Sequence, residues 1–259
     1  YTGEASEGTI GDIAILGDAI VFVGTEISHI NAATVIDVSG QIVAPGFIDP
    51  HTHSLSDLQS ADEVKRRNDN YRFQGVTTVF NGNDGFGNPD ITGVFQNLKD
   101  GGIGTNTALF IGHGATRSQV MGNANREPTD AELEGMKALV TSGMETGALG
   151  LSTGLFYAPG SFSKTDEVIE LAKIAAQYGG VYDSHIRDEA SYNIGLEAAI
   201  DEVLEIGREA EIPVHIAHIK ALGVDVWGKS EPIIETINAA RVEGQKITAD
   251  QYPWPASGT

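Results

Sequence analysis

The apolar positions of the chain follow one pattern up to residue 46 and another beyond it. In the first part, short apolar runs lie between turn residues and no helical period occurs. Gly17 and Asp18 separate the first two runs and predict a tight hairpin turn. We therefore expect residues 1–46 to form part of a small N-terminal β-sandwich domain, with strands at 12–16, 19–23, 34–38 and 41–44.

From residue 47 onward, apolar runs typical of buried parallel strands alternate with segments of helical period. The runs begin 32 to 41 residues apart, which suits repeated βα units. This repetition predicts that residues 47–259 form an α/β domain, a (β/α)8 TIM-type barrel. Its strands are expected to begin near Val43, Gly75, Thr107, Ala148, Val181, Pro213 and Lys246.

The ends of the expected helices carry recognisable signals. Thr129 and Glu132 have the spacing of a capping box, and Gly147 marks the end of the same helix. Ser230 and Pro232 mark the start of a later helix. An eighth strand would begin after Thr259, and an unclosed barrel exposes two strand edges. We therefore expect this sequence to be a partial chain, with about seven barrel strands present.

Composition narrows the classes of partner and of metal ligand. The net charge of −20 makes nucleic acid and anionic membranes poor partners. No apolar run approaches the roughly eighteen residues of a membrane-spanning helix. The absence of cysteine leaves His, Asp, Glu or a modified Lys as possible metal ligands. No signal peptide is visible, so we expect a cytoplasmic protein, and the sequence leaves its oligomeric state open.

Histidines gather where the expected strands end, which is where barrels of this kind place their active sites. His51 and His53 follow the first strand two positions apart, so they share a face. His215 and His218 are an odd number of positions apart, so we assign His218 to the barrel interior and His215 to the helix side. Convergence on one rim predicts a metal site with the ligands His51, His53, Asp84, His185 and His218.

Other polar residues at the strand ends are candidates for substrate binding, each with a structural alternative. Lys220 shares a face with His218 and suits a substrate carboxylate, although a lysine at a strand end can also extend into solvent. Arg187 is suited to a carboxylate of the substrate or of a neighbouring residue. His113 is suited to polarising the substrate or to supporting the site. Asp84 itself has the alternative of a simple turn residue.

Several of these segments together resemble the N-acyl-D-amino-acid deacylase (D-aminoacylase) family of the amidohydrolase superfamily. The resemblance covers nearly the whole chain in order, and the set is specific although each segment alone is not. The segments are Gly46-Phe47-Ile48-Asp49-x-His51-x-His53, Tyr71-Arg72-x-Gln74-Gly75-Val76-Thr77-Thr78-Val79, Gly112-His113-Gly114-x-x-Arg117, Met144-Glu145-x-Gly147-Ala148-Leu149-Gly150-Leu151-Ser152-Thr153-Gly154-Leu155-x-Tyr157, Ser184-His185-Ile186-Arg187, His218-x-Lys220 and Tyr252-Pro253.

The resemblance implies a metal-dependent hydrolase that converts N-acyl-D-amino acids to a carboxylate and a free D-amino acid. By position, His185 and His218 match the ligands of a tight zinc site completed from the second strand, and His51 and His53 match a second, weaker site. The family's general base is an aspartate on the eighth strand, which we expect beyond Thr259. Positions used around the substrate match Tyr157, Lys220, Tyr252 and Ser257.

The chain departs from the family at the second strand, where the family often has Gly-Asn-Cys-Gly. Here the stretch is Gly82-Asn83-Asp84-Gly85. A carboxylate oxygen is harder than a thiolate, so we expect weaker zinc binding and greater tolerance for Mn or Co.

Two alternative functions stay open at this point. Many amidohydrolases bridge two metals with a carbamylated lysine on the fourth strand, and residues 148–155 contain no lysine. This absence counts against a cyclic-amide hydrolase of the dihydroorotase or hydantoinase type. The other alternative is a non-catalytic barrel that binds metal.

Overall fold

The structure is a computed structural model, and it describes residues 1–3, 7–25 and 31–256. The chain divides into two compact units, residues 1–47 and 48–259. The predicted domain boundary, between residues 46 and 47, lies one position before the division between these two units.

The first unit contains the predicted hairpin. Strand β1 (Asp12–Leu16) pairs antiparallel with β2 (Ala19–Gly24). Gly17 in the turn has a φ of +64°, a conformation that glycine adopts without steric cost. The strands predicted at 34–38 and 41–44 are wrong, because these segments form no strand in the described part of the unit. An apolar run becomes a strand only when its backbone groups pair with those of a neighbour.

The second unit is built on a seven-stranded sheet in which the strands follow one another in chain order. Strands β4 to β9 all pair in parallel, and β3 joins the sheet beside β4. The sheet confirms the seven predicted barrel strands. They are β3 (Phe47–Asp49), β4 (Val76–Asn81), β5 (Asn106–Gly112), β6 (Gly150–Gly154), β7 (Val181–His185), β8 (Val214–Ile216) and β9 (Ile247–Ala249).

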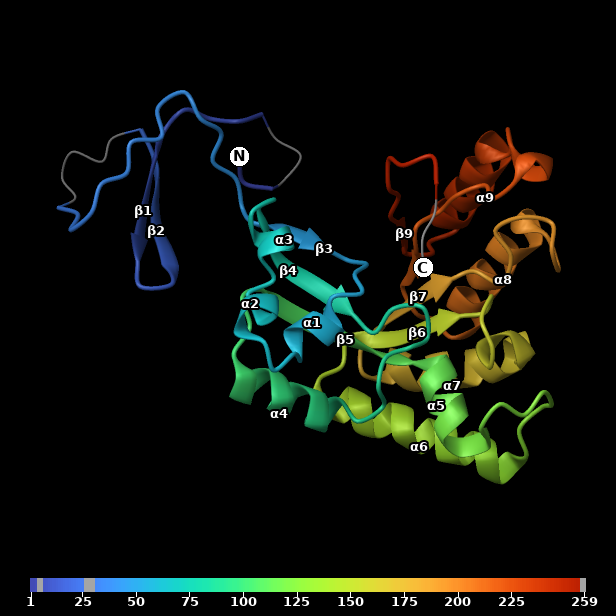
Figure 1. The fold of residues 1–259 in the computed structure, drawn as a ribbon. Coiled ribbons are helices and arrows are strands. Elements are labelled where there is room, and N and C mark those ends of the chain that lie inside the picture. The colour runs from blue at the N-terminus through green and yellow to red at the C-terminus, as the bar shows by residue number, and fades with distance from the viewer. Residues whose placement is uncertain (4–6, 26–30, 257–259) are drawn as a thin grey trace. The chain divides into compact units, whose positions relative to one another are not determined.

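Helices follow the strands and line one face of the curved sheet (Figure 1). Helix α6 begins with the predicted capping box of Thr129 and Glu132, and Gly147 ends it in a left-handed conformation. Side chains of α6, α7 and α8 form much of the apolar core with the strands. The longer helices are α4 (Ile91–Gly101), α5 (His113–Met121), α6 (Asp130–Thr146), α7 (Thr165–Gln177), α8 (Leu196–Glu209) and α9 (Ser230–Val242); α1 (Leu55–Leu58), α2 (Glu63–Arg66) and α3 (Asp69–Arg72) are short.

Alternation along β8 shows which side chains face the helices. A Cβ atom on Gly207 of α8 would lie 2.3 Å from Val214 Cγ2, so Val214 points toward α8. His215 therefore points to the opposite face, where its ring nitrogens contact Thr248 Oγ1 at 2.8 Å and Asp250 Oδ2 at 2.7 Å. The prediction that His215 packs on the helix side is wrong.

The described residues form seven consecutive strands of a (β/α)8 barrel, with helices after each of the first six strands, in agreement with the predicted incomplete barrel. The C-terminal ends of its strands lie together and carry the residues of interest. Among the described residues, no helix combines the length and the apolar character that a membrane span requires.

Candidate metal centre

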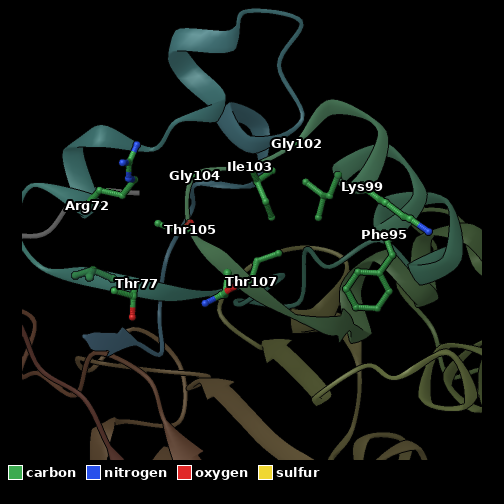
Figure 2. A pocket seen from close by; sticks show the side chains of 12 residues that line it. Arg72, Thr77, Phe95, Lys99, Gly102, Ile103, Gly104, Thr105 and Thr107 are labelled. Atoms are coloured by element: carbon green, nitrogen blue, oxygen red, sulfur yellow. The ribbon is translucent and has the colours of Figure 1, made fainter. Parts of the chain in front are cut away.

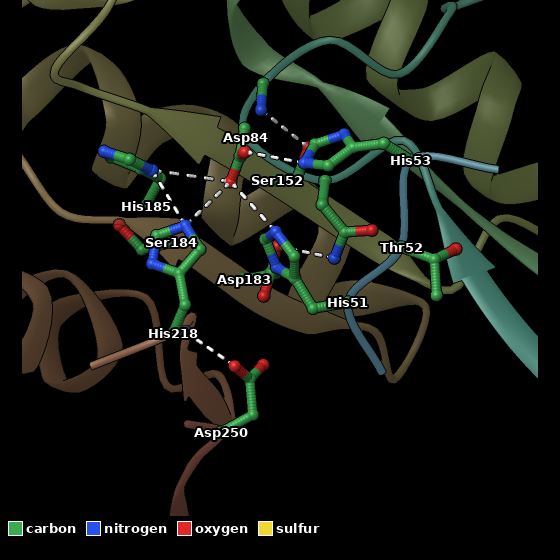
Figure 3. A network of polar contacts seen from close by, with 12 residues as sticks. His51, Thr52, His53, Asp84, Ser152, Asp183, Ser184, His185, His218 and Asp250 are labelled. Atoms are coloured by element: carbon green, nitrogen blue, oxygen red, sulfur yellow. Dashed lines mark hydrogen bonds and ion pairs between the residues drawn. The ribbon is translucent and has the colours of Figure 1, made fainter. Parts of the chain in front are cut away.

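Four histidine rings surround the carboxylate of Asp84 at the C-terminal ends of the strands (Figure 3). Asp84 Oδ1 lies 3.6 Å from Nε2 of both His51 and His218, and 3.7 Å from His185 Nδ1. Asp84 Oδ2 lies 3.3 Å from His53 Nε2. His185 Nδ1 and His218 Nε2 are 2.9 Å apart. All five residues proposed from the sequence as metal ligands thus come together in space.

A glycine-rich loop after β4 presents Asp84 to the histidines. Asp84 has a φ of +57°, a left-handed conformation that Asp tolerates better than most residues. Ser152 on β6 holds this loop, because its hydroxyl donates to the Gly82 carbonyl and accepts from Gly85 N at 3.1 Å. The loop is therefore fixed from the neighbouring strand.

His218 reaches the cluster from a position beyond the end of β8. Strand β8 ends at Ile216, and His218 has a φ of +35°. Its backbone N–H donates to Asp250 Oδ1 at 2.7 Å, which fixes the turn. Alternation along β8 does not extend to this residue, so His218 lies in the cluster for a different reason from the one predicted.

Buried atoms of the cluster lack hydrogen-bond partners among the described residues. They include Asp84 Oδ1, both ring nitrogens of His51 and Nε2 of His185. Buried polar atoms are normally paired, so an unpaired set at one point favours an ion bound there. Imidazole nitrogens with one carboxylate oxygen suit zinc and also Mn or Co. The donor set therefore fits a divalent metal.

Protonation favours metal binding at Asp84 and His185 and opposes it at His218. Burial alone would raise the pKa of Asp84, but contacts with His218, His51 and His53 hold it well below its ordinary value. Burial lowers the pKa of His185 to about 4, so its ring is neutral near pH 7. Burial also opposes charge on His218, but contacts with Asp84 and Glu189 outweigh it and raise its pKa to about 9. A metal that binds His218 must therefore displace a proton.

Among the described residues, overlapping sets of donors lie close enough to hold an ion, with the ligand atoms of each set within 4.8 Å of one another. One set is His51, Asp84 and His218, and another is His185, Glu189 and His218. The ammonium of Lys220 contacts Glu189 and lies 2.8 Å from His218 Nδ1. A cation at Glu189 would meet this positive charge, so the Asp84 side of the histidines is the better metal position.

Glu189 is placed to orient His218. Its Oε1 lies 3.2 Å from His218 Nδ1, the ring nitrogen that faces away from Asp84, and the side chain is buried. We expect Glu189→Gln to weaken zinc binding about 10- to 100-fold, because a carboxylate behind a ligand histidine fixes its tautomer and orientation. Equilibrium dialysis of the metal-free protein against zinc measures this change.

Glu202→Gln is the matched control for that experiment. Glu202 is also buried, but it pairs with Arg187. Its loss should lower stability and leave the zinc affinity of the folded protein unchanged. Equal zinc affinities in wild-type and Glu189→Gln proteins would refute the orienting role of Glu189.

The remaining residues predicted to bind substrate fall into two groups. Tyr157 lies at the centre, with its ring 4.7 Å from that of His185, and Lys220 Nζ lies 5.6 Å from the ring centre of Tyr252. His113 and Arg187 are instead buried and bound to carboxylates of the helices, His113 to Glu167 and Arg187 to Glu202. Their predicted contact with substrate stays untested. Ser257 lies outside the described residues.

Several residues that shape the centre escaped the sequence analysis. Asp183 is fully buried, accepts a hydrogen bond from Asn83 Nδ2 at 3.1 Å, and has its pKa raised to about 6 by burial. Its position two residues before His185 on the same strand was an available signal. Asp250 directly follows β9, which was also an available signal, whereas nothing local marked Ser152, whose partners lie far away in the sequence.

A cavity of about 650 Å³ lies away from the histidine cluster (Figure 2). Its walls include Thr77 at the start of β4, Thr107 at the start of β5, and Phe95 on α4. In parallel barrels the chemistry lies at the other ends of the strands. We therefore do not assign this cavity to the reaction.

The curled parallel sheet and the histidine cluster at its strand ends define a barrel of the metal-dependent hydrolase class. A family model described as "Amidohydrolase family" matches residues 34–250. This match covers more than half of the chain, which therefore belongs to the amidohydrolase family.

Within this family, the chain is similar to D-aminoacylases in both sequence and structure. D-aminoacylase of Alcaligenes xylosoxydans xylosoxydans is 35% identical over 283 residues, covering 99% of this chain and 56% of that protein. A crystal structure of D-aminoacylase superposes with a TM-score of 0.88 at 34% identity, covering 97% of this chain and 56% of that one. The chain thus spans about half the length of the relatives it matches.

Two further structures bear on the metal and on the alternative function. N-acyl-D-glutamate deacylase of Bordetella bronchiseptica, complexed with zinc and a phosphonate inhibitor, has a TM-score of 0.82 at 33% identity over 91% of this chain and 53% of that one. L-hydantoinase of Arthrobacter aurescens has a TM-score of 0.60 at 18% identity over 90% of this chain and 52% of that one. The latter likeness shows the fold alone.

Proposed function

We propose that the full-length protein hydrolyses the amide bond of N-acyl-D-amino acids, releasing a carboxylate and a free D-amino acid. The observation that carries this proposal is the buried Asp84 carboxylate among four histidines at the strand ends. The relatives that cover nearly all of this chain support the substrate class, since they are D-aminoacylases and N-acyl-D-amino-acid deacylases.

In this proposal Asp84, His185 and His218 hold the tightly bound metal, and His51 and His53 serve a second, weaker position. A bound divalent metal lowers the pKa of water to near neutrality and polarises an amide carbonyl. Zinc is the first candidate, and the carboxylate of Asp84 extends the choice to Mn or Co.

The protein's own groups bind the substrate and move its protons. Lys220 offers an ammonium to the α-carboxylate, and Tyr157 and Tyr252 offer hydroxyls. Glu189 and Asp250 are unsuited to act as the general base, because they are bound to Lys220 and to His215. In this proposal the general base is the eighth-strand aspartate that the family resemblance implies. We also propose a cytoplasmic location and no nucleic-acid partner, because a net charge of −20 disfavours binding to nucleic acid.

The proposal is tested with the full-length protein, loaded with zinc or with manganese, against a panel of N-acetyl-D-amino acids and their L-enantiomers. We expect free amine to be released from at least one D-substrate and at least tenfold faster than from its enantiomer. Opening of hydantoins or dihydroorotate in place of this reaction would favour the cyclic-amide alternative. Metal binding without hydrolysis of any amide would favour the non-catalytic one.

A further inference from the structure

A smaller cavity, of about 290 Å³, opens directly beside Asp84. Its floor is formed by backbone at four glycines, and the rings of Phe86 and Tyr157 form a wall with their centres 5.6 Å apart. Ala115 and Ser118 of helix α5 line another side. The glycines are Gly85, Gly114, Gly154 and Gly160.

The close approach of this backbone explains why the floor carries no side chains. A Cβ atom on Gly154 would lie 2.2 Å from the carbonyl oxygen of Asp84, and one on Gly160 would lie 2.7 Å from the carbonyl oxygen of Gly154. Real Cβ atoms do not come so close to backbone atoms. The hollow beside Asp84 is therefore built into the packing of two loops.

The cavity and Lys220 flank the histidine cluster at different points. Tyr157 of the cavity wall lies 4.7 Å from the His185 ring, and His185 lies 4.5 Å from the His218 ring. Lys220 follows, with Nζ 2.8 Å from His218 Nδ1. The cavity is lined by Asp84 and Tyr157, whereas neither His218 nor Lys220 lines it.

The geometry of an amide predicts which parts of the substrate would lie at Lys220 and at the cavity. A secondary amide is planar and trans, so its acyl chain and its Cα leave the C–N bond in opposite directions. In an N-acyl-amino acid, the Cα carries both the α-carboxylate and the side chain. If the α-carboxylate lies at Lys220 and the amide lies at Asp84, the acyl chain is directed away from Lys220.

We propose that the cavity beside Asp84 is the binding site for the acyl group of the substrate. This inference rests on the proposed function. A volume near 300 Å³ is at the lower end for small-molecule sites, so the cavity suits acyl chains of a few carbons and not long fatty acyl chains. The rings of Phe86 and Tyr157 supply an apolar wall for such a chain.

The test fills the cavity from helix α5 in the full-length enzyme. Ala115→Leu adds bulk inside the cavity, and Ser118→Leu adds the same side chain one turn further along the helix. Rates are measured with N-formyl, N-acetyl and N-butyryl derivatives of the D-amino acid that the wild-type enzyme prefers, and with N-acetyl derivatives of other D-amino acids. Gln119→Leu is the control, because Gln119 is exposed on the same helix and does not line the cavity.

We expect Ala115→Leu to lower kcat/KM for the butyryl substrate, relative to the formyl substrate, at least tenfold, since misfit by methylene groups costs about 10- to 200-fold. Ser118→Leu should act in the same direction, which keeps the test decisive if Ala115→Leu does not fold. The ranking of D-amino acids should stay unchanged, and Gln119→Leu should match the wild type.

A changed amino-acid ranking with an unchanged acyl ranking would assign the cavity to the side chain and overturn the inference. Unchanged rankings of both kinds in a folded variant would also overturn it. These outcomes differ from failure of the proposed function, in which the wild-type enzyme itself would release no amine from any acyl derivative.

Discussion

Asp84→Asn is expected to lower zinc affinity more than about 100-fold and to abolish amide hydrolysis. Changes to residues behind the ligands typically cost 10- to 100-fold in metal affinity, so loss of a direct anionic ligand should cost more. Asn also tolerates the left-handed conformation at this position, where φ is +57°, so the substitution removes the charge and keeps the turn. Zinc titration of the metal-free protein and amine release from the best N-acyl-D-amino acid measure the two effects.

Asp84→Cys is the matched comparison, because it exchanges one anionic ligand for a softer one. We expect this variant to keep tight zinc binding and to lose affinity for manganese relative to zinc. If Asp84→Asn bound zinc as the wild-type protein does, Asp84 would be only a turn residue and the metal site would have to be placed elsewhere.

The second large effect concerns stability. Glu167 on α7 is bound to the fully buried guanidinium of Arg117, and its Oε1 lies 2.8 Å from His113 Nε2. Burial alone would raise the pKa of Glu167, but its contacts with His113 and Arg117 lower it, so the carboxylate is charged. Glu167→Gln leaves the Arg117 charge buried without its counter-ion, and we expect a loss of about 3–5 kcal/mol in the free energy of unfolding. Urea unfolding followed by circular dichroism measures it.

Glu170→Gln is the control on the same helix. Glu170 pairs with Lys137 and Lys173 at the surface, and its side chain is 36% exposed. Exposed ion pairs contribute little, so this variant should lose less than about 1 kcal/mol. If the two variants lost equal stability, the buried ion pair of Glu167 would contribute no more to the free energy of unfolding than the exposed pairs of Glu170, which would contradict this prediction.

The regular part of the fold was predictable because each element carries its own local signal. Seven apolar runs at a nearly constant spacing predict seven barrel strands, and the sheet contains the seven expected strands in order. The capping box at Thr129 predicts the start of α6 for the same reason, since its partners are three residues apart. The runs at 34–38 and 41–44 carry an equal apolar signal, but a strand also needs a partner, and a single run of residues does not reveal one.

The residues of the candidate metal centre also differ in whether a local sequence signal marks them. The grouping of His51, His53, Asp84, His185 and His218 could be predicted because all lie at or shortly after strand ends, which parallel barrels gather on one rim. The partners of these residues could not be found in this way. Ser152 holds the Asp84 loop from another strand, and Glu189 contacts His218 only through the packing of two loops. Neighbours of this kind depend on three-dimensional packing and have no fixed spacing in the sequence.

The central claim is that Asp84, together with His185 and His218, holds the tightly bound metal. Anomalous diffraction at the zinc edge from crystals of the full-length, zinc-loaded protein tests it most directly. We predict a zinc peak at about 2.0–2.2 Å from a carboxylate oxygen of Asp84 and from one ring nitrogen of each histidine. A peak bound by His185, Glu189 and His218, with Asp84 out of reach, would contradict the claim.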